Sequence, residues 1–207
     1  ADCKLAGEAG ADIVFAPAVE SVYPPGFRTY VEVHELQDVL CGAARPGHFR
    51  GVCTVVLKLL NMVQPDVAYF GQKDAQQALI LTRMVRDLDF PMEMHTLPTV
   101  REQDGLALSS RNRYLTAEQR RNAPAIFRAL QAVKLRIEAG ERDSARVEAE
   151  LNRELSAIPG ARVDFARVVS AESLTPLPHL AGPVLIAVAV FFGTTRLIDN
   201  IQLHVPV

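Results

Sequence analysis

Apolar and polar positions in the first half of the chain alternate between short strand-like runs and stretches with helical spacing. Residues 49–63 repeat apolar side chains at three- and four-residue intervals, and Pro65 follows, so this segment predicts a helix. A second helix is expected over residues 74–88. Strands are expected at residues 11–17, 28–33, 67–70 and 92–97. Strands that alternate with helices in this way predict an α/β fold with a parallel, doubly wound sheet and helices on both of its faces.

The periodic pattern breaks off in the middle of the chain. Residues 99–114 are rich in charged and small side chains and predict a functional loop, in which Arg101 and Glu102 are expected to form a surface ion pair. Thr116 is the expected N-cap of a long helix that ends near Gly140. A further helix is expected at residues 144–158, and strands at residues 163–169, 184–191 and 196–203. This order predicts a separate α+β domain that begins near residue 112.

Composition excludes several classes of protein. The net charge of −2 argues against a nucleic-acid-binding protein, which would present a basic face. The longest apolar run, residues 184–192, is far shorter than the ~20 residues that a membrane-spanning helix needs. The three cysteines are widely spaced and favour reduced thiols in a cytoplasm over disulfides, and the five histidines stand apart without zinc-ligand spacing. We therefore expect a cytoplasmic globular protein with no metal held by its own side chains.

Residues 71–74 follow a buried strand and precede a helix, which is where open α/β sheets bind ligands. Gly71 lets a ligand approach the backbone, and a helix N-terminus favours anionic groups. Lys73 offers a cation to a phosphate or carboxylate, and Asp74 can accept hydrogen bonds from ribose hydroxyls. Gln77 lies one helical turn beyond Lys73 and can face the same cleft. The alternative is an ordinary strand-to-helix turn with an exposed lysine and an N-capping aspartate.

A second candidate segment lies in the predicted loop and contains Ser109, Ser110 and Arg111. Two hydroxyls and a guanidinium can hold a polyphosphate and stabilise the charge that develops on a pyrophosphate leaving group. A helix cap followed by a solvated basic run is the alternative. Arg45 and His48 precede the first predicted helix and are candidates for an anion-binding rim, although a lone histidine in such a place is more often structural.

Together these motifs resemble one family, the pantothenate synthetases or pantoate–β-alanine ligases. The resemblance rests on the order and spacing of residues 45–52, 64–66, 70–77, 104–115 and 196–200, and it extends over essentially the whole chain. It implies a Rossmann-like domain of the nucleotidyltransferase superfamily over residues 1–111, incomplete at its N-terminus, and a small α+β lid domain over residues 112–207. It also implies an AMP-forming ligase that, with Mg²⁺, converts pantoate and ATP to pantoyl adenylate and pyrophosphate. The adenylate then reacts with β-alanine to give pantothenate and AMP.

The resemblance also assigns roles to the candidate residues. Lys73, Ser109, Ser110 and Arg111 are the expected catalytic and phosphate-binding residues, and the serine–serine–arginine segment is the counterpart of the second nucleotide-binding signature of class I aminoacyl-tRNA synthetase-like enzymes. The remaining expected contacts are Gly71 and Asp74 with the ribose, Val100 and Leu108 with the adenine, Gln77 with pantoate, and Arg45 and His48 at the rim. Gln72 stands where the family usually has glutamate, and Ala75 where an aromatic residue is common. Neither is expected to be a main ligand.

One family signature does not occur in the sequence. The His-x-Gly-His motif is absent, and so is the following strand with its pantoate-binding asparagine and glutamine. We therefore expect that upstream sequence is missing from the chain, and that these residues alone form an inefficient ligase that does not fold well by itself.

Two other functions are left open. A related adenylyltransferase that acts on a phosphorylated substrate would use the same nucleotide-binding fold, and an inactive fragment would only bind nucleotide or mediate dimerisation. The resemblance further implies a homodimer, and a hinge at residues 99–111 through which the lid domain closes over the nucleotide.

Overall fold

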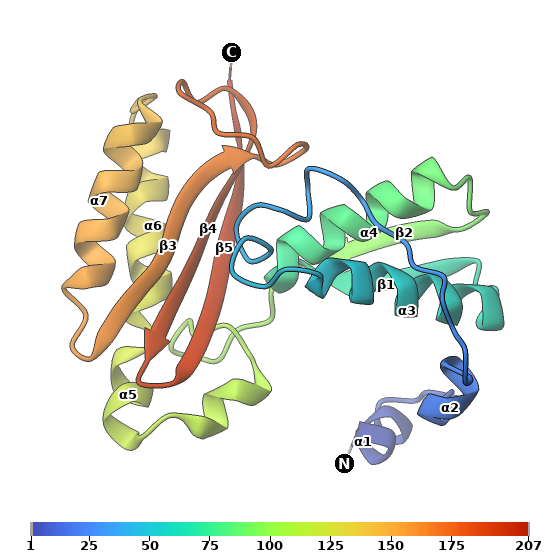
Figure 1. Cartoon of the computed structure of the whole chain (residues 1–207). Coiled ribbons are helices and arrows are strands. Elements are labelled where there is room, and N and C mark those ends of the chain that lie inside the picture. The colour runs from blue at the N-terminus through green and yellow to red at the C-terminus, as the bar shows by residue number, and fades with distance from the viewer. Residues whose placement is uncertain (1, 207) are drawn as a thin grey trace.

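The computed structural model of the chain describes residues 2–206 and divides into two packed units (Figure 1). The first unit contains a pair of strands and the helices beside them, and the second contains a three-stranded sheet and two long helices. The helices are α1 Asp2–Glu8, α2 Val19–Val22, α3 His48–Val63, α4 Ala75–Asp87, α5 Ala117–Asn122, α6 Ala125–Glu138 and α7 Ser144–Ser156, with short 3₁₀ helices η1 Gln72–Asp74 and η2 Ser110–Tyr114. The strands are β1 Val67–Gly71, β2 Glu93–Leu97, β3 Ala161–Ser170, β4 Gly182–Phe192 and β5 Thr195–Val205.

Strands β1 and β2 pair in parallel, and α4 connects them as the β-α-β pattern predicts. Ala68, Phe70 and Met94 face the apolar cluster that α3 and α4 share. On the opposite face Tyr69 is 63% exposed and stacks on His95. The Rossmann-like class of the fold is therefore confirmed, but within residues 2–206 helices cover only one face of this sheet, and not both as expected.

Strands β3, β4 and β5 form an antiparallel sheet in the order β3-β4-β5, which confirms the three strands expected in the second half. Helices α6 and α7 cover one face of it, and the unit that contains α3 and α4 packs against the other (Figure 1). Because both faces are covered, β4 is buried along almost its whole length and reads as a continuous apolar run. The apolar cluster of α3 and α4 extends into the second unit, where Leu185 and Ala187 of β4 pack with Phe49 and Leu81.

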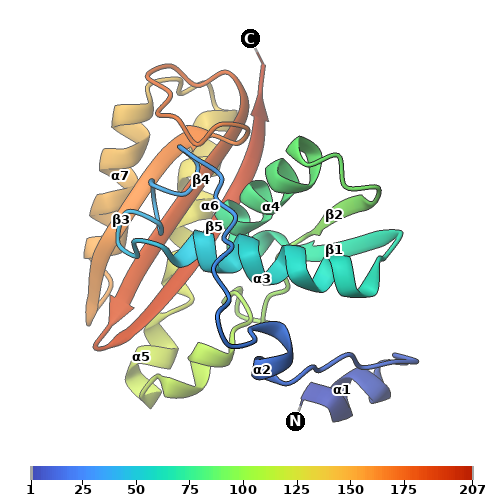
Figure 2. The same cartoon turned by 45° about the vertical axis from the view of Figure 1, so that its right-hand side comes forward.

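Two expected strands do not form. Residues 11–17 have no regular secondary structure and are exposed apart from Pro17, and residues 28–33 run along α3, where the Val31 amide donates to Thr54 Oγ1. Burial alternates from Val31 to His34 as predicted, but neither segment has a strand beside it in the described part of the chain. Figure 2 shows the segment between α2 and α3 crossing α3 to reach the antiparallel sheet and then turning back.

The long helix expected after Thr116 is two helices. Thr116 is the N-cap of α5, as predicted, and forms a capping box with Gln119. The helix then ends at Asn122, and α6 begins after Pro124, because a proline inside a helix lacks the amide hydrogen and clashes with the preceding turn.

None of the helices within residues 2–206 is both long and apolar enough to span a bilayer.

Candidate active site

A cleft lies where the turn after β1, the start of α3 and the middle of β5 meet, and it holds about 590 Å³ of empty space, part of which is open solvent. It brings together predicted residues from three separate segments of the chain. Those that line it are Arg45, His48, Lys73, Asp74, Gln77 and Arg111. A smaller hollow beside it is lined by Lys73, Arg111 and Ser109. The remaining predicted residues, Gly71, Val100, Leu108 and Ser110, line neither space.

The turn after β1 places two charged side chains, Lys73 and Asp74, in the wall of the cleft. Gly71 has an extended backbone with φ of −83°, and a Cβ atom placed there would meet nothing within 4 Å. Neither conformation nor packing therefore requires glycine at this position. Asp74 precedes α4 but makes no side-chain capping hydrogen bond, so the alternative of an N-capping aspartate is wrong. Lys73 is only 18% exposed, and its Nζ lies 3.5 Å from Asp74 Oδ2.

Two consecutive glutamines on α4 have different environments. Gln77 lines the cleft, as expected of a substrate contact. Gln76 is buried and holds the preceding loop, because its Nε2 donates to the carbonyls of Leu36 and Val39 at 2.9 and 2.7 Å. Its Oε1 accepts from the Cys41 amide at 3.0 Å. Gln76 therefore shapes the wall of the cleft, although sequence reasoning gave it no role.

Arg45 and His48 form a hydrogen-bonded pair at the start of α3. Arg45 donates to His48 Nε2 at 3.0 Å, which leaves this nitrogen as the acceptor of a neutral imidazole. Burial, followed by the positive charges of Arg45 and Arg111, lowers the pKa of His48 below 6.5, and Asp74 opposes this only in part. The cleft therefore has a positive potential that suits a polyphosphate or a carboxylate.

The loop motif takes the form of a short 3₁₀ helix. Ser109 Oγ accepts from the Arg111 amide at 3.2 Å, so Ser109 does cap this helix, as the alternative interpretation held. Arg111 nevertheless lines the cleft, while Ser110 is exposed. Val100 and Leu108 lie opposite each other in the linker between the two units, residues 99–111, since the Leu108 amide donates to the Val100 carbonyl at 2.9 Å. The side chains of both residues are exposed.

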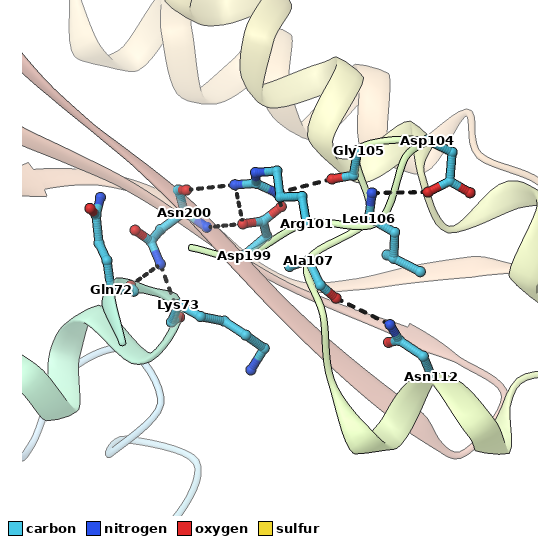
Figure 3. A network of polar contacts seen from close by, with 10 residues as sticks. All are labelled: Gln72, Lys73, Arg101, Asp104, Gly105, Leu106, Ala107, Asn112, Asp199 and Asn200. Atoms are coloured by element: carbon cyan, nitrogen blue, oxygen red, sulfur yellow. Dashed lines mark hydrogen bonds and ion pairs between the residues drawn. The ribbon is translucent and has the colours of Figure 1, made fainter. Parts of the chain in front are cut away.

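The expected surface ion pair between Arg101 and Glu102 does not exist. Arg101 instead makes two hydrogen bonds of 2.6 and 2.9 Å with Asp199 of β5 (Figure 3). Glu102 pairs with Arg120 at 2.6 Å. Adjacent residues in an extended segment point to opposite sides, so they reach different partners. Arg120 holds the pKa of Glu102 below its usual value through this hydrogen bond.

Strand β5 contributes residues to the cleft for which sequence reasoning gave no role. Arg196 lines it with its guanidinium 3.6 Å from Cys41 Sγ and 2.8 Å from the carboxylate of Asp164. Asp199 and Asn200 line it further along the strand. The signal in the sequence that could indicate such a role is the presence of polar residues, such as Asp199 and Asn200, inside an otherwise apolar strand. Within residues 2–206, no three His, Cys, Asp or Glu side chains gather as a metal site.

These features define a nucleotide-binding α/β enzyme: a Rossmann-like unit and a small α+β unit enclose a cationic cleft beyond the carboxyl end of a parallel strand. The sequence profile of the pantoate-beta-alanine ligase family matches residues 1–202. The chain therefore belongs to the pantoate–β-alanine ligase family, as the motifs indicated. A related adenylyltransferase and a fragment that only binds nucleotide are not favoured.

Curated relatives and solved structures agree with this assignment. The chain is 60% identical to the pantothenate synthetase of Moorella thermoacetica over 99% of this chain and 72% of the relative. It resembles the crystal structure of pantothenate synthetase from Thermus thermophilus with a TM-score of 0.93 and 48% identity, over 98% of this chain and 74% of that one. A structure of the Francisella tularensis ligase in complex with beta-gamma ATP and beta-alanine is 29% identical, with a TM-score of 0.72 over 97% of this chain and 68% of that one.

Proposed function

We propose that the protein joins pantoate to β-alanine through a pantoyl-adenylate intermediate. The observation that carries the proposal is the grouping of Lys73, Arg111 and Arg45 around one cleft, with Gln77 beside them. Three cations suit the polyphosphate of ATP together with a substrate carboxylate, and an amide side chain can hydrogen-bond both a hydroxyl and a carboxylate. The crystal structure of the Francisella tularensis relative, complexed with beta-gamma ATP and beta-alanine, supports the same pair of substrates.

In the first step a carboxylate oxygen of pantoate attacks the α-phosphorus of ATP. The new bond makes the mixed anhydride, and the bond to the β-phosphate breaks with its electron pair leaving on pyrophosphate. Lys73 and Arg111 stabilise the negative charge that develops on this leaving group, assisted by Ser109 and Ser110. Burial and the charges of Arg45 and Arg111 lower the pKa of His48 in the absence of ligand, which favours a neutral imidazole that can act as a hydrogen-bonding group beside the phosphates.

In the second step the amine of β-alanine attacks the acyl carbon of the adenylate. AMP leaves with the carboxylate oxygen that had bonded to phosphorus, and the amine loses a proton as the amide of pantothenate forms. No covalent bond to the protein is needed. The protein therefore acts by positioning the reactants and by stabilising charge.

The other contacts are proposed from the resemblance to the family, and of their residues Asp74, Gln77, Arg45 and His48 line the cleft. The carboxylate of Asp74 is not used as a helix cap and can accept from the ribose hydroxyls, and the free space at Gly71 lets the ribose approach. The backbone of Val100 and Leu108 receives the adenine, and Gln77 holds pantoate. Arg45 and His48 form the rim.

Mg²⁺ is proposed as the accompanying ion. Mg²⁺ is usually held by one or two carboxylates, water and substrate phosphates. Of the two carboxylates that line the cleft, Asp199 is paired with Arg101 at 2.6 Å, whereas Asp74 is half exposed and has only the longer contact of 3.5 Å with Lys73. This donor set fits an ion carried mainly by the phosphates, where it neutralises part of their charge.

We further propose a cytoplasmic homodimer in which the units at residues 1–111 and 112–207 form two domains, the second of which moves as a lid. Closing over the nucleotide would keep water away from the adenylate. The apolar cluster between α3, α4 and the antiparallel sheet limits the movement, because a wide opening would expose Leu185 and Ala187. A small displacement of the linker at residues 99–111 preserves this cluster.

Isotope exchange between ATP and pyrophosphate, measured on the purified protein, tests the proposed reaction. Exchange is expected with pantoate and is expected to be absent without it. Exchange that responds instead to a phosphorylated alcohol would identify an adenylyltransferase. ATP binding in a calorimeter without AMP formation in the presence of pantoate and β-alanine would support a nucleotide-binding module and overturn the proposal.

A further inference from the structure

Strand β5 carries two consecutive buried polar residues, one of which contacts the turn at residues 71–74 and the other the segment at residues 99–111. Asp199 and Asn200 are each 4% exposed. Asn200 pairs with Ala187 across the sheet, on the face that packs against α3 and α4, whereas Asp199 pairs with Val188, on the face covered by α6 and α7. Residues opposite each other in an antiparallel pair share a face, so the two side chains point in opposite directions. Figure 3 shows them reaching different segments.

Asn200 holds the backbone of the lysine turn. Its Nδ2 donates to the carbonyls of Gln72 and Lys73 at 2.9 and 3.0 Å, so one amide group fixes two successive peptide units (Figure 3). These bonds cross between the two units of the fold, since the turn belongs to the first and β5 to the second. No other side-chain hydrogen bond is made to either carbonyl within the described residues. The position of Lys73 in the cleft therefore depends on the position of β5.

Asp199 fixes the strand from the other side. It accepts two hydrogen bonds from Arg101 and a third, of 2.8 Å, from the backbone amide of Asn200, so the backbone of Asn200 is held as well. Arg101 also donates to the Gly105 carbonyl at 3.1 Å and stacks 3.7 Å from the ring centre of Phe127. The linker that leads to Ser109 and Arg111 is thus tied to the same point of β5.

We propose that Asn200 is a positioning residue for Lys73. The proposal rests on the phosphate-binding role that the proposed function gives to Lys73. In this proposal Asn200 acts through the backbone of Lys73: it sets where that backbone lies, and hence where Nζ can reach when pyrophosphate leaves. Loss of the amide releases the turn, and a displacement of about 1 Å at a reacting group can lower a rate by ~100-fold.

A double-mutant cycle tests the coupling between the two residues. The rate of adenylate formation is measured in a single turnover for Asn200→Ala, Lys73→Ala and the double variant, in the complete protein. Asn200→Ala is expected to be slower by ~10- to 100-fold. In the Lys73→Ala background the same change is expected to have little further effect, because the side chain that Asn200 positions is gone. Effects that multiply in the double variant overturn the proposal.

The isosteric change Asn200→Asp provides a second readout. A carboxylate cannot donate to the two carbonyls, whereas its protonated form can donate to one. The variant is expected to gain activity relative to the native protein as the pH is lowered, and a pH profile parallel to that of the native protein contradicts the proposal. This comparison holds even if Asn200→Ala does not fold.

The controls separate this proposal from the proposed function. Gln202→Ala removes an exposed amide two residues further along β5 and is expected to keep the native rate. If Lys73→Ala keeps the native rate, the role given to Lys73 is wrong and the positioning proposal fails with it. If Lys73→Ala is slow but Asn200→Ala is as fast as Gln202→Ala, only the positioning proposal fails.

Discussion

Replacing Arg101 by leucine tests whether the ion pair with Asp199 stabilises the junction between the two units. The Asp199 side chain is 4% exposed and that of Arg101 is 18% exposed, so the variant leaves a buried carboxylate without its cationic partner. Removal of one partner of a buried pair costs about 3–5 kcal/mol. The backbone amide of Asn200 still donates to Asp199 in this variant, and the leucine side chain at position 101 still covers the ring of Phe127. We therefore expect a loss near the lower limit, about 3 kcal/mol.

Urea unfolding followed by circular dichroism measures this loss. With a slope of about 2 kcal/mol per molar urea, the midpoint of the Arg101→Leu variant should fall by about 1.5 M. The double variant Arg101→Leu/Asp199→Asn should recover most of the lost stability, because the amide side chain that replaces the Asp199 carboxylate carries no charge and its oxygen can still accept from the backbone amide of Asn200. Arg153→Leu is the matched control: this side chain is 70% exposed, and its loss should cost no more than about 0.5 kcal/mol. An Arg101→Leu variant as stable as this control, or a double variant no better than the single one, refutes the reasoning.

Three further predictions concern the cleft and the linker. The pKa of His48, followed by NMR, should lie below 6.5 and rise when ATP is added, because the phosphates offset the charges of Arg45 and Arg111. If the pKa of His48 does not change when ATP is added, the cleft is not cationic as described. The imidazole binds a proton more readily in the unfolded chain than in the folded protein, so the contribution of His48 to stability is present above pH 6.5 and is lost as the pH falls below that value. Cys53 is fully buried with a thiol pKa of about 11 and should resist iodoacetamide, whereas Cys41 should react and be protected by ATP; equal labelling of both would be contrary to the structure. Proteolysis within the linker should slow with ATP and pantoate, and an unchanged rate counts against the lid.

Much of the fold after residue 48 could be predicted because its periodicity is local. The helix at α3 and the three strands of the antiparallel sheet appear in the sequence as regular apolar spacing. The segments at residues 11–17 and 28–33 have the same local pattern, yet a strand also needs a neighbour with which to form a ladder, and no pattern within a segment reports one. The break between α5 and α6 does have a local signal, since Pro124 cannot continue a helix that begins at residue 117.

The candidate site was only partly accessible to local reasoning. The chemistry of Lys73 and Arg111 left the alternatives open, and the resemblance between the motif order and one family placed them in one site. The partners of Arg101 could not be read from the sequence, because Asp199 is 98 residues away and its neighbour Glu102 offered a nearer carboxylate. Long-range pairs of this kind depend on the packing of β5 against the linker, which no local pattern reveals.

The transfer of oxygen from pantoate to AMP tests the central claim most directly. Pantoate labelled with ¹⁸O in its carboxylate is incubated with ATP, Mg²⁺, β-alanine and the complete protein, and the products are examined by mass spectrometry. An adenylate intermediate predicts one ¹⁸O atom in each AMP and none in pyrophosphate. Label found in inorganic phosphate with ADP as the nucleotide product, or AMP without label, would contradict the account.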